Sequence, residues 1–152
     1  MGVSKFAYPE KIFFDYKSDP NTRSFLSGVD IDLTSDCKFG LPTLEQVKFA
    51  IAQTSYDYIE GKIIEDFGRQ RWANSLSKNG EIMTAIYIDN VKNDKDEIDS
   101  ISFERGDETA ILEFLWHLSK FCGSILFYVS AGNMTLVRTD RTMERIREDL
   151  GY

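Results

Sequence analysis

Few side chains in this sequence have types and spacings suited to catalysis or metal binding. His117 is the only histidine, and Cys37 and Cys122 are the only cysteines. A three-histidine metal site is therefore excluded, while a pair of His117 with either cysteine is left open by composition. Because His117 stands among apolar residues, three after Phe114 and four before Phe121, we predict that it packs against them. We predict no metal, no cofactor and no catalytic residue.

A short acidic motif is the most specific chemical pattern in the chain. The segment Asp30-Ile31-Asp32-Leu33-Thr34 resembles the Asp-x-Asp-x-Thr signature of the haloacid dehalogenase-like phosphotransferases. The resemblance implies that Asp30 is a nucleophile and Asp32 a general acid, beside magnesium at a strand end. The lysine and downstream acids that complete such a site cannot be placed here. We predict no phosphatase activity, and a phosphotransferase or hydrolase using these two residues is the enzymatic alternative.

Other ligand-binding loops are not supported by the sequence. The same acids do not fit a calcium-binding loop. Ser35 occupies the position of the turn glycine, and Leu41 occupies the position of the bidentate glutamate. Gly80, Gly123 and Gly132 are isolated at turns rather than grouped in a phosphate-binding loop. We therefore predict neither a calcium nor a nucleotide site.

A run of acids marks the candidate binding site. The segment Asp89–Asp99 holds five acids and two lysines, a net charge of −3. Such a run usually forms a solvated hairpin tip, and it can also be a landing surface for a basic protein. We predict that the partner-binding residues are Asp94, Asp96, Glu97 and Asp99.

The charge of the whole chain points to the same kind of partner. The 152 residues carry a net charge of −7, and the isoelectric point is about 4.7. Residues 28–108 hold 17 acids and 9 bases, while the two flanks together hold 8 acids and 9 bases. Nucleic acid is an unsuitable partner because the chain lacks a clustered cationic stripe. A basic protein fits this charge better.

Length and composition predict one soluble domain. A chain of this length buries roughly two thirds of its unfolded surface without metal or disulfide help, so we predict that residues 1–152 form a single globular domain. Its longest apolar run falls short of the roughly 20 residues that span a membrane, and Met1–Tyr16 lacks the order of a signal peptide. We expect a cytoplasmic protein with two free thiols and no membrane partner.

The strands are predicted from alternating or continuous apolar runs. Two early strands are expected at Ala7–Tyr16 and Phe25–Leu33. Two hairpins follow, whose strands are Glu81–Asp89 with Ile98–Phe103, and Ser124–Val129 with Met134–Val137.

Three helices carry clear start or stop signals. Thr43–Glu60 begins with a capping box, Asp107–Cys122 ends at Gly123, and Arg141–Leu150 follows Asp140 as its expected cap. A fourth, Lys62–Leu76, is indicated by spaced apolar residues including Trp72. Because hairpins imply antiparallel pairing, we predict an α+β fold: an antiparallel-rich sheet with three to four helices packed against it.

The later part of the chain shows one resemblance to a known class. The runs Phe-Glu-Arg-Gly-Asp-Glu, Leu-Glu-Phe-Leu-Trp-His-Leu, Gly-Ser-Ile-Leu-Phe-Tyr and Met-Thr-Leu-Val lie within Phe103–Val137. This pattern of a helix between apolar strands resembles the C-terminal part of small bacterial immunity proteins, which neutralise secreted or contact-delivered toxins. It implies a protein that inhibits a cognate toxin by occluding its active site.

These observations favour a non-catalytic protein-binding protein over an enzyme. Within that class the sequence suggests an immunity protein. A phage-derived or housekeeping assembly module is a further alternative.

Overall fold

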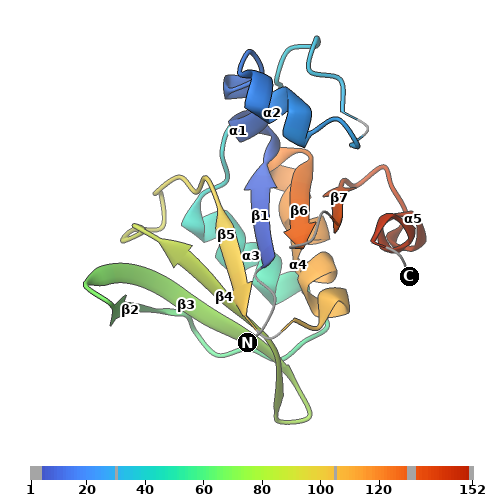
Figure 1. Ribbon diagram of the computed structural model, residues 1–152. Coiled ribbons are helices and arrows are strands. Elements are labelled where there is room, and N and C mark those ends of the chain that lie inside the picture. Colours follow the sequence, from blue (N-terminus) through green and yellow to red (C-terminus); the bar gives the residue numbers. More distant parts are fainter. Residues whose placement is uncertain (1–4, 30, 105, 130–132, 151–152) are drawn as a thin grey trace.

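The computed structural model describes residues 5–29, 31–104, 106–129 and 133–150. Its strands form one seven-stranded sheet in the order β2-β3-β4-β5-β1-β6-β7, and each neighbouring pair is antiparallel (Figure 1). The strands are β1 (Lys5–Pro9), β2 (Lys62–Asp66), β3 (Arg69–Lys78), β4 (Glu81–Asp89), β5 (Ile101–Glu104), β6 (Ile125–Val129) and β7 (Asn133–Val137). The predicted α+β fold with an antiparallel-rich sheet is therefore confirmed.

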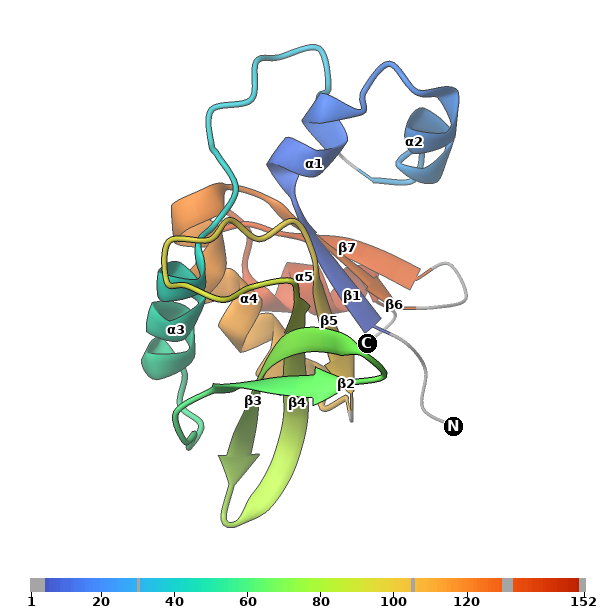
Figure 2. The ribbon, with the colours of Figure 1, turned by 90° about the vertical axis from the view of Figure 1, so that its left-hand side faces the viewer.

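The helices fall into two groups. They are α1 (Glu10–Asp15), α2 (Pro20–Phe25), α3 (Leu44–Gln53), α4 (Glu108–Cys122) and α5 (Met143–Asp149). Helices α3, α4 and α5 pack on one face of the sheet, whereas α1 and α2 follow β1 directly and lie beyond its end (Figures 1 and 2).

Helix α4 is the centre of the main core. Asp107 begins it by accepting hydrogen bonds from the backbone N–H groups of Thr109 and Ala110, and Gly123 ends it with a φ of 75°. Eight of its residues are buried: Ala110, Ile111, Leu112, Phe114, Leu115, Leu118, Ser119 and Cys122. The helix is therefore covered on more than one side, as its nearly continuous apolar sequence predicts.

Strands β3 and β4 show how the sheet meets this helix. Alternate residues are buried along each strand, and the buried sets are Trp72, Asn74 and Leu76 on β3, and Thr84, Ile86 and Ile88 on β4. Because successive side chains of a strand point to opposite faces, these residues share the helix-covered face.

A second, smaller apolar cluster lies on the other face of the sheet. Its buried members are Phe13, Phe14, Leu26, Leu126 and Leu136. Leu126 and Leu136 are opposite each other on β6 and β7. The α1–α2 region thus covers part of the sheet face that lies opposite to α4.

The sequence prediction of a helix at Lys62–Leu76 is wrong. This segment contains β2, a tight turn and the first part of β3, and the turn residues Phe67 and Gly68 have φ angles of 51° and 77°. Positive φ at both central residues defines the turn type favoured in two-residue hairpins. Trp72 and Leu76 misled the prediction because a spacing of four puts residues on one face of a helix and also on one face of a strand.

The two early strand predictions are also wrong in part. The expected strand Ala7–Tyr16 ends at Pro9, and helix α1 begins at Glu10. In place of the expected strand Phe25–Leu33, Phe25 ends α2, and residues 26–29 and 31–33 are turns or irregular segments whose apolar side chains pack on the second cluster. The prediction rested on apolar residues at every second position. A loop that packs against an apolar cluster also needs apolar residues, so this spacing did not distinguish a strand from a buried loop.

Two helix boundaries differ from the prediction. Helix α3 starts with the predicted capping box at Thr43 but ends at Gln53, because Thr54 is extended (φ −71°, ψ 161°) and its hydroxyl donates to the carbonyl of Ile51 at 2.8 Å. Helix α5 is capped by Thr142 rather than Asp140. The turn between β6 and β7, at residues 130–132, lies outside the described residues.

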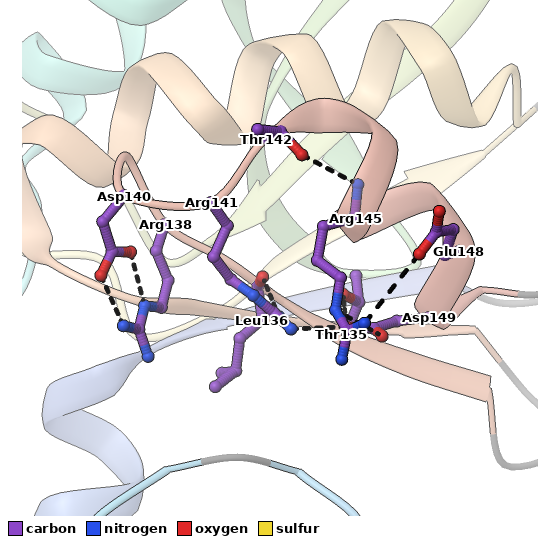
Figure 3. Close-up of polar contacts among 9 residues, drawn as sticks. All are labelled: Thr135, Leu136, Arg138, Asp140, Arg141, Thr142, Arg145, Glu148 and Asp149. Carbon is purple, nitrogen blue, oxygen red and sulfur yellow. Dashed lines mark hydrogen bonds and ion pairs between the residues drawn. The ribbon is translucent and has the colours of Figure 1, made fainter.

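Side chains of α5 and of the segment just before it tie the helix to the edge strand β7 (Figure 3). Arg141 donates to the carbonyl of Leu136 at 3.0 Å and pairs with Asp149 at 2.9 Å. Asp149 also accepts from the hydroxyl of Thr135 at 3.1 Å. Asp140, the expected cap, instead accepts two hydrogen bonds from Arg138.

The burial of α4 predicts a large cost for shortening one of its core side chains. Replacement Leu115→Ala removes a fully buried side chain and should lower the free energy of unfolding by about 2–5 kcal/mol. Urea denaturation measures this change. The control Ile59→Ala, at a residue that is 79% exposed, should change it by about 0.5 kcal/mol or less. Equal effects at both positions would contradict the placement of α4.

Candidate functional site

The predicted acidic site lies in the loop between β4 and β5, at residues 90–100. Two apolar side chains fix this loop to the main core, because Val91 and Ile98 are each only 1% exposed. The loop is therefore not a freely solvated tip. It lies along the N-terminal end of α3 (Figure 2).

Main-chain hydrogen bonds join the loop to that end of α3. The carbonyls of Asp96 and Asp94 accept from the backbone N–H groups of Leu44 and Glu45, at 3.1 and 2.9 Å. The N–H group of Ile98 donates to the carbonyl of Pro42 at 2.8 Å. The first N–H groups of a helix lack partners inside the helix, so the loop satisfies two of them. This fixes the position of the loop's backbone.

The four predicted acids lie in this one loop and have different surroundings. The carboxylate of Asp94 pairs with Lys48 at 2.7 Å. The carboxylate of Asp96 accepts from the backbone N–H groups of Lys92 and Asn93, at 2.8 and 2.9 Å, and these hydrogen bonds lower the pKa of Asp96.

The other two acids of the loop are more available. Glu97 and Asp99 are exposed, and neither forms an ion pair with another residue in the described part of the chain. Asp99 accepts a hydrogen bond from the hydroxyl of its neighbour Ser100 at 3.4 Å. A partner could therefore reach these two carboxylates without first breaking an ion pair.

The acidic loop is adjacent to α1. Figure 2 shows the end of the loop that leads into β5 passing near the start of this helix. The pKa of Lys11 on α1 is raised chiefly by its hydrogen bond to Asp15, and the charge of Glu97 contributes to the same shift. The charge of Glu97 therefore acts on a residue of α1.

In the other predicted motif, Asp30 to Thr34, the carboxylate of Asp32 binds a residue of the motif itself. Asp32 accepts hydrogen bonds from both the backbone N–H group and the hydroxyl of Thr34, and these bonds lower the pKa of Asp32. This arrangement is an Asx turn in an irregular segment, whereas the phosphotransferase resemblance implies a strand end. Asp30 lies outside the described residues.

Asp32 lines a polar cleft of about 480 Å³ together with other charged side chains. Glu10 accepts from the backbone N–H group of Ser124 at 2.7 Å, and Asp140 accepts from Arg138 at 2.8 Å. Several charged side chains of this cleft therefore already have hydrogen-bond partners within the protein.

The histidine and the cysteines lie in separate surroundings. His117 is half-buried, its ring contacts that of Trp116, and burial together with Lys120 lowers its pKa. Cys122 is fully buried, and burial raises the pKa of its thiol to about 12. Cys37 donates to the carbonyl of Phe39. Among the described residues no group of three or more His, Cys, Asp or Glu side chains could hold a metal ion.

A pocket of about 390 Å³ lies between α1, α2 and the sheet. Its lining is Tyr8, Ile12, Phe13, Tyr16, Asn21, Thr22, Phe25, Leu26 and Leu126. Sequence reasoning missed it because a strand was predicted where α1 stands and no helix was predicted at Pro20–Phe25. One signal was present: Asp19 before Pro20 is a typical helix start, and Asp19 does cap α2 by accepting from the N–H group of Asn21.

Comparisons of the chain with protein-family models, with curated proteins and with solved structures found no match. None of the helices in the described part of the chain has the length and apolar content that a membrane span requires. The assignment of a function therefore depends on the geometry of the chain itself.

The surroundings of Asp96 predict a titration in acid. Its hydrogen bonds favour the charged carboxylate, so its contribution to stability is present above the ordinary aspartate pKa of 3.8 and is lost as pH falls through the lower folded-state value. The amide chemical shifts of Lys92 and Asn93, followed by NMR as the pH falls, should titrate with a midpoint below 3.8.

Two variants control for other acids. Asp96→Asn should abolish this titration step, while Asp99→Asn should leave it in place. A midpoint at or above the ordinary aspartate value would contradict the hydrogen bonds described for Asp96.

Proposed function

We propose that this chain is a non-catalytic protein-binding protein whose partner is basic. One observation carries the proposal: the acid excess of the chain lies within residues 28–108, and there the acidic loop is tied to α3 by main-chain hydrogen bonds. An acidic surface of this kind attracts a basic protein and raises the rate of encounter.

The anchoring of the loop supports binding in a second way. A flexible loop loses conformational entropy when a partner orders it, and this loss weakens binding. Here Val91, Ile98 and the bonds to α3 already order the backbone. Exposed carboxylates at Glu97 and Asp99 are thus presented at little further entropic cost.

Within this class we propose an immunity protein that inhibits a cognate bacterial toxin by occluding its active site. Support comes from the resemblance noted within Phe103–Val137, a segment that runs from β5 through α4 to β7. Many such toxins cut nucleic acid and have basic active sites, which an acidic protein would complement. The mechanism is steric and electrostatic and requires no chemistry by this chain.

The charge of the loop predicts the kinetics of binding. A partner captured by affinity from the source cell would be tested against wild type and the double variant Glu97→Gln/Asp99→Asn. We expect the association rate at low salt to fall by about 3–10-fold and its salt dependence to flatten, because steering depends on these charges. One exposed charge contributes only about 0–1 kcal/mol, so both are changed together.

A matched control separates local charge from net charge. The variant Glu81→Gln/Glu144→Gln removes two exposed acids on β4 and α5 and changes the net charge equally. It should keep the association rate within about twofold of wild type. Equal slowing by both pairs, or capture of a partner that is not basic, would overturn the proposed binding surface.

Co-expression tests the immunity proposal separately. If the captured partner is a toxin, this chain should restore the growth of cells that produce it. Binding without any protection would overturn the immunity proposal and leave the protein-binding proposal standing.

A further inference from the structure

The pocket between α1 and α2 has the composition of a site for an apolar side chain. Ile12, Phe13, Leu26 and Leu126 form much of its lining. Phe13, Leu26 and Leu126 are themselves buried and belong to the second apolar cluster, which gives the pocket a packed floor. The residues that line it carry no charge. A charged ligand would lose hydration there without gaining a partner.

Aromatic rings surround the mouth of this pocket. Tyr16 is 59% exposed and Phe25 is 44% exposed, although both are large side chains. Phe25 also contacts Tyr128 on β6, with ring centroids 5.5 Å apart. Aromatic rings prefer tilted or edge-to-face contacts with other rings, so this mouth suits another aromatic group. The side chains of Asn21 and Thr22 add polar groups to the lining.

The size of the pocket limits what it can hold. At about 390 Å³ it lies near the lower end of the roughly 300–1,000 Å³ range of ligand pockets. One aromatic side chain fits this volume better than an extended ligand. Partner proteins often contribute such a side chain as the central anchor of an interface, surrounded by polar and charged contacts.

We infer that this pocket receives an aromatic side chain of the same basic partner that the acidic loop attracts. The inference rests on the proposed function and adds the chemistry of a second contact. Helix α1 links the two parts, because Ile12 and Phe13 line the pocket and the charge of Glu97 on the acidic loop acts on Lys11 of the same helix. The uncharged pocket and the acidic loop thus lie on either side of α1, and a partner that covers both would present a basic surface with a protruding Trp, Tyr or Phe.

A small probe tests the pocket without the partner. N-acetyl-tryptophanamide would be titrated into isotope-labelled protein and followed by NMR. We expect saturable amide shifts within residues 12–26 and at Leu126, with a Kd in the millimolar range. N-acetyl-leucinamide at the same concentrations should bind at least about fivefold more weakly, since it lacks the ring.

Pocket-filling variants complete the test. Thr22→Trp and Asn21→Trp each place a ring at the lining and should abolish the shifts. Ser24→Trp is the matched control, because Ser24 is exposed on the same helix and does not line the pocket. It should bind the probe as wild type does. The amide spectrum of each filling variant is first compared with that of wild type, to show that the fold is kept away from the pocket. One variant that passes this check is enough for the test.

The outcomes separate this inference from the proposed function. The inference about the pocket is overturned, whatever the charge variants show, by any one of four results. These are no binding of the probe, shifts centred elsewhere, equal binding of the leucine probe, and unchanged binding by both filling variants. With the captured partner, Thr22→Trp should raise the dissociation rate at least about tenfold and leave the salt dependence of association unchanged. If Thr22→Trp leaves that dissociation rate unchanged, the partner's anchor is not in this pocket and the inference fails, while the acidic loop remains tested by its own variants.

Discussion

The burial of α4 is the constraint on which the rest of the structure depends. A helix whose apolar residues extend around most of its surface is stable in water only when other elements cover it. The sheet covers one side, and the alternating buried residues of β3 and β4 provide the matching face. Helix α3 packs beside α4, and an edge-to-face contact between Phe49 and Phe121 joins the two helices near the surface. The position of α3 is therefore set by the core.

That position determines where the acidic loop lies. The start of α3 presents N–H groups that need acceptors, and the carbonyls of Asp94 and Asp96 supply them. The acids of this segment consequently divide by role: Asp96 orders the loop through its own carboxylate, whereas Glu97 and Asp99 are held outward. The exposed position of these two acids thus follows from the way in which the core places one helix terminus.

Local signals predicted part of this structure well. Strand β4 and helix α4 were found because each has a strong period and, for α4, a cap at both ends. The helix expected at Lys62–Leu76 was wrong because its apolar spacing also fits a strand, and only pairing with a neighbour distinguishes the two. The acidic loop was visible as a run of charge. The aromatic pocket was not, because its lining comes from β1, α1, α2 and β6, which only the fold brings together.

The proposed binding surface comprises the acidic loop and the aromatic pocket, on either side of α1. Hydrogen–deuterium exchange, measured on the chain alone and bound to its captured partner, tests this most directly. Binding should slow exchange in two segments at once, at residues 91–99 and at residues 12–26, because one partner covers both. Slowing confined to the β2–β3 hairpin, with both of these segments unchanged, would contradict the account.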